Sequence, residues 1–317
     1  MTGVILDNST FDRGDVDLSS VENSIPNWIR YDSTPHHMAA ERVDGADIVI
    51  TNKVRITGEV VDNCPRLKLV LLAATGTDNV DLNVCRENGI DVCNARQYST
   101  PSVVQHTMMM MLALATNAMR YQDDIRQNCW QDSDIFCLLN HQIIELDGRQ
   151  LGILGYGNLG KKVAAAGRAL GMRIGICARP GGPEQDGRQN FETFLSESDV
   201  ISIHCPLTDA TRNLIDSRAF KLMKPGAILL NTARGAIVDS SALVNALKSG
   251  QISGAGIDVL DQEPPGWDHP LTQPEIPNLM LTPHNAWGSR ESRQRLIEQM
   301  ATCLDSWIRG TPMNLVN

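Results

Sequence analysis

Three side chains with complementary acid–base chemistry lie in the last third of the sequence: Arg234, Glu263 and His284. A planar guanidinium can hold a carboxylate and polarise a neighbouring carbonyl. An imidazole titrates near neutral pH and can protonate the alkoxide that forms when a hydride reaches a carbonyl carbon. A carboxylate against the second ring nitrogen would fix the histidine tautomer and favour its protonated form. The set predicts hydride transfer to a small 2-keto acid, coupled to protonation.

Each of these residues also has a structural interpretation when it is taken alone. An Arg before Gly is often a surface ion-pair partner, a Glu-Pro pair is often a turn, and a single His is often structural. The three gain weight because each follows a short apolar run typical of a strand, at 227–231, 256–259 and 280–282. Parallel sheets bind ligands at the carboxyl ends of their strands, so we expect the three side chains at one sheet edge.

A glycine pattern at mid-chain predicts a dinucleotide site. It follows the apolar run 151–154 and opens a helical pattern that closes at Gly171. In such a pattern the first glycine makes a tight turn, the second admits a pyrophosphate, and the third lets helix and strand pack closely. The alternative is a glycine-rich structural turn. The residues of the pattern are Gly155, Tyr156, Gly157, Asn158, Leu159 and Gly160.

The end of the next strand, predicted at 173–177, normally carries the residue that recognises the adenosine ribose. NAD sites place an Asp or Glu there to bind the 2′-hydroxyl. Here Ala178 takes that position and Arg179 follows. A guanidinium can pair with a 2′-phosphate, so we expect a preference for NADP over NAD. The alternative is that Arg179 only stacks on the adenine, with loose specificity.

Apolar runs alternate with helical patterns along almost the whole chain, which is typical of parallel α/β proteins. Because the glycine pattern lies at mid-chain, we expect a Rossmann dinucleotide-binding domain, residues 100–287, inserted into a flavodoxin-like substrate domain, residues 1–99 and 288–317. Both would be doubly wound parallel sheets. The predicted helices include 101–119 and 289–309. Further strands are predicted at 4–6, 48–50, 67–73, 90–93 and 200–204.

Composition excludes several other classes of protein. The formal charge is −9 and no Lys/Arg cluster stands out, so neither nucleic acid nor an anionic membrane is an expected partner. No apolar stretch approaches the ~20 residues that span a bilayer, and no secretory signal is visible. Eight scattered cysteines without a CxxC pair predict free thiols rather than disulfides or a metal site, and hence a cytoplasmic location.

Several motifs together resemble the D-isomer-specific 2-hydroxyacid dehydrogenase family over nearly the whole chain, most weakly in residues 1–40. Beside the glycine pattern and the Arg, Glu and His segments, these are 75–81, 98–106 and 204–208. The resemblance implies catalytic roles for the Arg, Glu and His already named. It also implies substrate-carboxylate contacts from Thr75 and Gly76, and cofactor contacts from Thr107, His204, Pro206, Ala233, Arg234, Asp258 and His284.

Within the family, the segments 284–287 and 76–79 resemble glycerate dehydrogenase and hydroxypyruvate or glyoxylate reductase most closely. Trp287 would then wall a small polar pocket, or serve as a packed aromatic at the domain hinge. Family members usually dimerise through the nucleotide domain, so the run Met108–Met111 is expected at a homodimer interface or in the core. Two functional alternatives stay open: another 2-hydroxy acid, phosphorylated or larger, and a dinucleotide-sensing corepressor.

Overall fold

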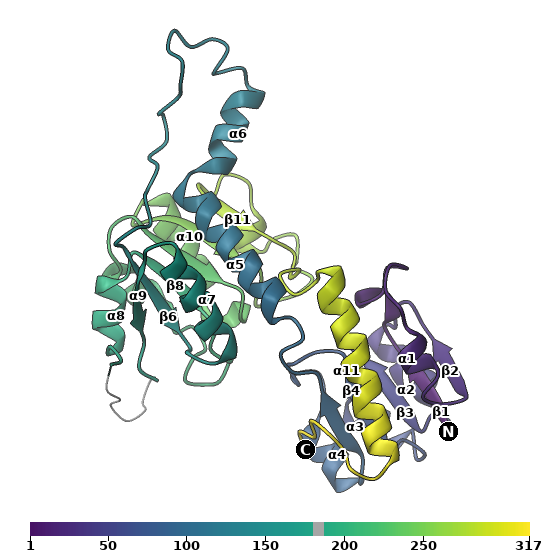
Figure 1. Cartoon of the computed structure of the whole chain (residues 1–317). Helices are drawn as coiled ribbons and strands as arrows, with labels where there is room; N and C mark the ends of the chain where they lie inside the picture. Colours follow the sequence, from purple (N-terminus) through teal and green to yellow (C-terminus); the bar gives the residue numbers. More distant parts are fainter. Residues whose placement is uncertain (180–186) are drawn as a thin grey trace. The chain divides into compact units, whose positions relative to one another are not determined.

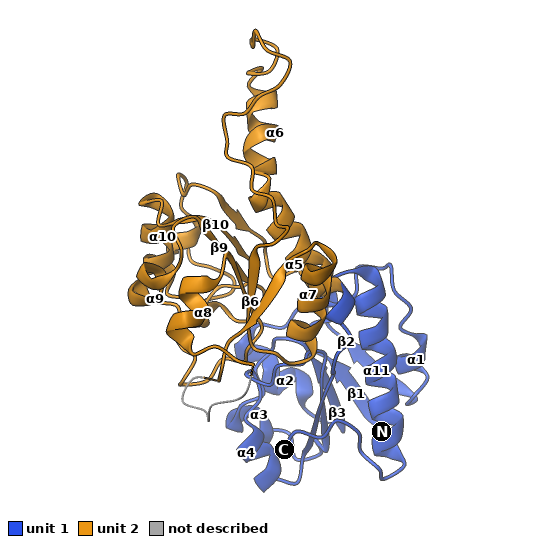
Figure 2. Ribbon diagram, turned by 60° about the vertical axis from the view of Figure 1, so that its left-hand side comes forward, with its two compact units in different colours: residues 1–101, 287–317 blue, residues 102–286 orange. Residues whose placement is uncertain are grey.

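The computed structural model describes residues 1–179 and 187–317, which divide into two compact units. Unit 1 consists of residues 1–101 and 287–317, and unit 2 of residues 102–286 (Figure 2). Each unit holds one parallel sheet with helices on both faces. The expected fold class, two doubly wound α/β domains, is confirmed.

The sheet of unit 1 has the strand order β2-β1-β3-β4-β5. Its inner strands are continuous apolar runs because both faces are covered. In β3, for example, Ile48 and Ile50 pack with helix α11, and Val49 packs on the opposite face. The strands are β1 (Thr2–Ile5), β2 (Asn27–Arg30), β3 (Ile48–Thr51), β4 (Leu69–Leu72) and β5 (Asp91–Asn94).

The helices of unit 1 include the long carboxyl-terminal helix α11, which buries Leu296, Met300 and Leu304. Strand β2 was absent from the sequence prediction, since it is a largely exposed edge strand without an apolar run. The helices are α1 (Ser19–Glu22), α2 (Ala39–Val43), α3 (Gly58–Asp62), α4 (Leu82–Glu87) and α11 (Arg290–Ile308), with 3₁₀ turns η1 (Asn8–Thr10) and η2 (His36–Met38).

The sheet of unit 2 has the strand order β11-β10-β9-β8-β6-β7. The chain passes from β6 to β7 on one side and then continues through β8 on the other. This reversal is the point at which open α/β sheets bind ligands. The strands are β6 (Gln150–Leu154), β7 (Arg173–Ile176), β8 (Val200–Ile203), β9 (Ala227–Asn231), β10 (Ile252–Ile257) and β11 (Leu279–Leu281).

The single helix expected over 101–119 is two helices, so that prediction was wrong (Figure 1). Asn117 adopts a left-handed backbone, with φ of 51°, and this breaks the helix. The helices of unit 2 are α5 (Thr100–Ala115, which begins at its boundary), α6 (Ala118–Arg126), α7 (Asn158–Ala169), α8 (Phe191–Glu197), α9 (Ser217–Leu222) and α10 (Ser240–Lys248), with 3₁₀ turns η3 (Gly235–Ile237) and η4 (Pro270–Thr272).

The methionine run of α5 faces two environments. Met110 and Met111 are fully buried against α7 and the sheet, whereas Met109 is 39% exposed. Beyond α5, helix α6 and the following loop project from the rest of unit 2 in both ribbon views. We call residues 118–145 the arm.

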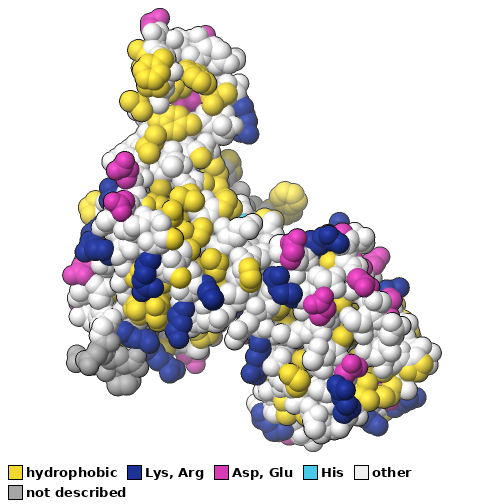
Figure 3. Space-filling model, viewed as in Figure 1, with side chains coloured by type: hydrophobic (Ala, Val, Ile, Leu, Met, Phe, Trp, Pro, Cys, Tyr) yellow, Lys and Arg dark blue, Asp and Glu magenta, His cyan; other side chains and the backbone are white. Residues whose placement is uncertain are grey.

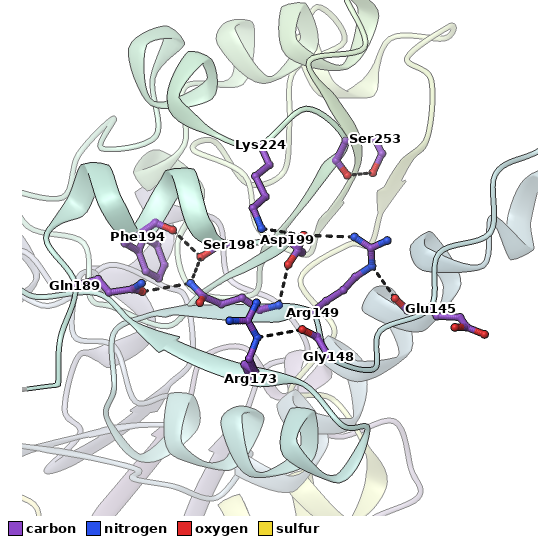
Figure 4. A network of polar contacts seen from close by, with 12 residues as sticks. Glu145, Gly148, Arg149, Arg173, Gln189, Phe194, Ser198, Asp199, Lys224 and Ser253 are labelled. Atoms are coloured by element: carbon purple, nitrogen blue, oxygen red, sulfur yellow. Dashed lines mark hydrogen bonds and ion pairs between the residues drawn. The ribbon is translucent and has the colours of Figure 1, made fainter.

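A polar network around Asp199 lies at the edge of the unit 2 sheet where its strands begin (Figure 4). The Asp199 carboxylate accepts from the backbone of Gln150 at 2.8 Å and from Lys224 Nζ at 3.1 Å, and Arg149 lies 3.4 Å away. Burial raises the pKa of Asp199, but these donors outweigh it and lower the pKa overall. The network therefore ties the starts of three strands together.

Among the described helices, none combines the length and apolarity that a bilayer crossing requires. All eight cysteines are free, and five of them are buried. The described residues contain no group of three or more His, Cys, Asp or Glu arranged to hold a metal ion.

Candidate active site

The three acid–base side chains follow three neighbouring strands of unit 2. Arg234 follows β9, Glu263 follows β10 and His284 follows β11. Since β9, β10 and β11 are adjacent and parallel, all three loops leave the same edge of the sheet. The strand order, which the sequence does not specify, is what makes them neighbours.

Glu263 and His284 form a direct pair. His284 Nδ1 lies 2.6 Å from Glu263 Oε2, and the other carboxylate oxygen accepts from the backbone of Leu260 at 2.8 Å. Each carboxylate oxygen of Glu263 thus has a hydrogen-bond partner, and the carboxylate fixes the orientation of the imidazole. The two side chains are 31% and 26% exposed, so they are reachable from solvent.

The Arg234 loop is shaped by a buried asparagine. Asn231, at the end of β9, accepts from the backbone of Ala233 at 3.0 Å and donates to the carbonyl of Arg234 at 2.9 Å. Arg234 also donates to the Ala233 carbonyl. Asn231 is not among the predicted site residues, although an asparagine directly after an apolar strand pattern is a signal for such a turn.

Gly235 brings this loop against the loop that carries Glu263. A Cβ at Gly235 would lie 1.9 Å from the carbonyl carbon of Leu260, which is far inside van der Waals contact. Only glycine permits this approach. The loops after β9 and β10 are therefore in backbone contact, three residues before Glu263.

His284 itself has a left-handed backbone, with φ of 50°. Non-glycine residues occupy this region at an energetic cost, and such residues cluster at functional sites. The Asp258 carboxylate anchors the segment by accepting from the backbone amides of Asn285 and Ala286, each at 3.0 Å. Asp258, which is expected to contact the cofactor, thus already accepts hydrogen bonds from the backbone of the His284 segment.

The glycine pattern forms the turn between β6 and α7. A Cβ at Gly155, where φ is 101°, would lie 2.4 Å from the backbone nitrogen of Cys205. A Cβ at Gly160 would lie 2.2 Å from the carbonyl oxygen of Gly155, whereas one at Gly157 would meet nothing within 4 Å. The first and third glycines are needed for packing, and the second leaves open space. These residues fit a bound pyrophosphate at the amino end of α7.

His204 follows β8 and lies beside this turn. Its Nε2 is 2.8 Å from Ser202 Oγ, and its buried Nδ1 has no hydrogen-bond partner. Burial lowers the pKa of His204 to about 4, so the ring is neutral at physiological pH. An unpaired buried nitrogen beside the glycine turn is consistent with a polar ligand group at this position.

The other expected cofactor contacts lie on loops at the same edge or on α5. Thr107 is fully buried in α5, and its hydroxyl is 3.3 Å from that of Thr232. Pro206 follows β8 and accepts from Thr211 at 2.8 Å. Arg179 is exposed just beyond β7, next to Ala178.

The expected substrate residues outside the acid–base set belong to unit 1. Thr75 and Gly76 follow β4, and the Thr75 carbonyl accepts from Asn94 at 2.7 Å. Trp287 packs edge-on against Tyr98, with ring centroids 6.2 Å apart, and contributes to the core of unit 1. This contact agrees with the interpretation of Trp287 as a packed aromatic, and its place in a substrate pocket stays a prediction.

The sequence model of the D-isomer specific 2-hydroxyacid dehydrogenase NAD binding domain matches residues 108–286. The chain belongs to the D-isomer specific 2-hydroxyacid dehydrogenase family. The expected family is thus confirmed. Membership makes the protein an oxidoreductase with a domain for a nicotinamide dinucleotide, and this domain covers the Arg, Glu and His loops.

Two curated relatives in this family cover almost the whole chain. A glycerate dehydrogenase from Methylorubrum extorquens is 42% identical over 96% of this chain and 97% of its own. A hydroxypyruvate reductase from Blautia hydrogenotrophica is 34% identical over 99% of each. A solved acyclic imino acid reductase, in complex with NADPH and D-Arg, is 26% identical over the full length of both chains, with a TM-score of 0.87.

Proposed function

We propose that this protein reduces hydroxypyruvate or glyoxylate to the corresponding D-2-hydroxy acid, with Arg234, Glu263 and His284 as its catalytic residues. The observation that carries the proposal is the 2.6 Å contact between His284 and Glu263 at the sheet edge that also bears the glycine turn. The names of the relatives, glycerate dehydrogenase and hydroxypyruvate reductase, support this substrate class.

The roles of the three side chains follow from their chemistry. Reduced nicotinamide, when bound, supplies the hydride that reaches the carbonyl carbon. Arg234 binds the substrate carboxylate and polarises the keto oxygen through its planar guanidinium. His284 holds its Nδ1 toward Glu263, so Nε2 delivers the proton to the oxygen that becomes the hydroxyl. Glu263 stabilises the protonated ring and keeps it in this orientation.

We propose residues 1–99 and 288–317 as the substrate domain and 100–287 as the dinucleotide domain, with Thr75, Gly76 and Trp287 supplied by the former. Backbone N–H groups near Thr75 and Gly76 would bind the substrate carboxylate. Thr75→Ala should then have little effect, because the contact is from the backbone.

The test is turnover with a panel of 2-keto acids. We expect the highest kcat/KM with hydroxypyruvate or glyoxylate, and much lower values with phosphorylated or larger aliphatic acids. His284→Ala should lose most of kcat while binding cofactor normally, and Arg234→Ala should damage both KM and kcat. Near-normal activity of either variant would refute the role given to it. Cofactor binding without turnover of any acid would favour the corepressor-like alternative.

We also propose that NADP is preferred over NAD. The residue after β7 that would carry an acid is Ala178, and the exposed guanidinium of Arg179 follows it. Neither Ala178 nor Arg179 brings a carboxylate that would repel a 2′-phosphate, and Arg179 can pair with it. The imino acid reductase of similar fold was solved in complex with NADPH, which supports binding of a phosphorylated cofactor by such a fold.

Steady-state kinetics with NADPH and NADH test this preference. We expect kcat/KM to be higher with NADPH, and Arg179→Ala to lower it about tenfold while leaving NADH nearly unchanged. A loss that is equal for both cofactors would instead indicate stacking on the adenine. A tenfold preference of the wild-type protein for NADH would overturn the proposal.

The arm leads us to propose a homodimer formed through unit 2. Its exposed side chains include Phe136, 90% exposed, and Leu139, 73% exposed, and apolar atoms gather there on the surface (Figure 3). The arm is nevertheless fastened, since Tyr121 donates to the His141 carbonyl and His141 pairs with Asp124. An ordered, projecting apolar surface fits a second copy of the same surface in a two-fold interface.

Light scattering measures the oligomeric state directly. The wild-type chain should have the mass of a dimer, and the double variant Phe136→Asp, Leu139→Asp should shift toward monomer. Met313→Asp, at a side chain of unit 1 that is 49% exposed, is the matched control and should stay dimeric. A monomeric wild-type chain, or an unaffected double variant, would exclude this interface.

The free cysteines lead us to propose a cytoplasmic location. Five of the eight are buried as thiols, and burial raises the pKa of Cys177 to about 12, which keeps it unreactive. Reducing compartments preserve such thiols. Fractionation of the source cells should recover the activity in the cytoplasmic fraction.

A further inference from the structure

A chain of hydrogen bonds runs from helix α5 to the loop that carries His284. The hydroxyl of Thr282 donates to Asp258 Oδ1 across 2.5 Å, and His106 Nε2 lies 3.0 Å from the same hydroxyl. The Asp258 side chain is 1% exposed and that of His106 is 16% exposed. Neither Thr282 nor His106 has a part in the proposed proton transfer, yet both belong to this hydrogen-bond chain, which ends at the loop that carries His284.

The direction of each bond follows from the number of protons available. A hydroxyl carries one proton, and Thr282 gives it to the Asp258 carboxylate. The Thr282 oxygen can then only accept, so His106 must carry its proton on Nε2 and donate it. The bonds therefore run from His106 through Thr282 to Asp258, and they fix the tautomer of His106.

The Asp258 carboxylate holds the backbone on both sides of His284. It accepts from Thr282 before it, and from the amides of Asn285 and Ala286 after it. The backbone of His284 also donates to the Asp258 carbonyl at 2.8 Å. These bonds bracket a residue whose left-handed backbone would otherwise relax.

We propose that Thr282 and His106 are positioning residues for His284, acting through Asp258. The inference rests on the proposed function, because it assumes that His284 delivers the proton. If Thr282 lost its hydroxyl, the carboxylate would lose a charge-assisted bond and its fixed orientation. The 285–286 amides would then hold the loop less firmly, and the imidazole would spend less time in the reactive geometry.

The effect should fall mainly on kcat, since the glycine turn that fits the pyrophosphate, 155–160, belongs to a different loop. Asp258, itself an expected cofactor contact, keeps its two backbone donors. With hydroxypyruvate, Thr282→Val should lower kcat 10- to 100-fold, because a displacement of about 1 Å can cost about 10²-fold. Its KM for cofactor should change much less than kcat, and its melting temperature should fall by no more than a few degrees, because the buried Asp258 carboxylate loses one of its three donors and keeps the two backbone amides. Thr282→Ser keeps the hydroxyl and is the matched control, with kcat within threefold of wild type.

A second pair of variants tests the far end of the chain. His106→Leu removes the donor and should lower kcat several-fold, whereas His106→Gln offers an amide donor at similar reach and should recover most of the rate. The proposal is overturned if Thr282→Val turns over within twofold of wild type, if serine fails to rescue, or if cofactor affinity falls as much as kcat.

The proposed function is judged by different measurements. Turnover by the wild-type protein and its loss in His284→Ala stand or fall independently of residues 106 and 282. Normal turnover in Thr282→Val, in a protein where His284→Ala is inactive, therefore removes only the positioning role. An inactive wild-type protein would remove both.

Discussion

Gly235 and Leu260 meet backbone to backbone, so closely that a methyl group on Gly235 would lie 1.9 Å from the Leu260 carbonyl carbon. The contact joins the loop that carries Arg234 to the loop that carries Glu263. Two of the proposed catalytic side chains thus depend on a glycine that has no chemistry of its own.

Gly235→Ala should force these loops apart. Since the atoms met are backbone rather than a flexible side chain, relief requires a loop shift, at a cost of about 1–3 kcal/mol in stability. We expect kcat to fall at least tenfold and the urea midpoint to drop. Gly58→Ala is the control, because its added Cβ would meet nothing closer than 3.9 Å. Wild-type kinetics for Gly235→Ala would show that the loops tolerate separation.

Glu263→Gln tests whether His284 needs the negative charge of Glu263 or only a side chain of that size. The amide keeps the size of the side chain but no longer stabilises a protonated ring, so kcat/KM should fall by about 10²-fold. Steady-state rates with hydroxypyruvate measure this loss. Glu59→Gln, an exposed substitution in unit 1, should leave the rate unchanged. Equal rates for Glu263→Gln and wild type would contradict the role of the carboxylate.

His204 should make stability fall with acid. Burial holds its folded pKa at about 4, against about 6.5 in the unfolded chain. Between these values the unfolded state binds a proton that the folded state does not, so stability is fully present above pH 6.5 and is lost toward pH 4. Urea unfolding across this range should show a smaller acid loss for His204→Gln than for wild type.

The exposed His36 provides the control for that experiment. His36→Gln should retain the wild-type dependence on pH, because this side chain is exposed and the buried His204 is unchanged. If His204→Gln and wild type lose the same stability between pH 7 and pH 4.5, the neutral state of His204 contributes nothing to the acid response.

Asp199→Asn should weaken the fold without affecting the chemistry. The amide cannot satisfy both the Gln150 backbone and Lys224, and breaking a part-buried charged hydrogen bond costs about 1–3 kcal/mol. The network (Figure 4) lies where the parallel strands of the sheet begin, whereas the Arg, Glu and His loops follow the ends of the strands. Kcat at 25 °C should remain within twofold, and Asp62→Asn, at an exposed helix end, should cost little stability.

The alternation of strands and helices, the glycine turn and the family could all be predicted from the amino-acid sequence. These depend on local information, because a run such as Ile48–Ile50 is apolar on both faces only in a covered parallel strand. The pattern at 155–160 likewise requires glycines at fixed spacing within one turn. Local patterns failed at strand β2, which is exposed, and at Asn117, where one backbone conformation ends a helix.

Which loops become neighbours depends on the three-dimensional fold and could not be predicted from the sequence. The contact of Gly235 with Leu260, and the bonds from Asp258 to residues 282, 285 and 286, join positions about 25 residues apart in sequence. Such contacts arise from strand order and from the direction of side chains at strand ends, which hydrophobic periodicity does not encode. The same reason explains why the sequence predicts no role for the His106 side chain, since its hydrogen-bond partner Thr282 lies 176 positions away along the chain.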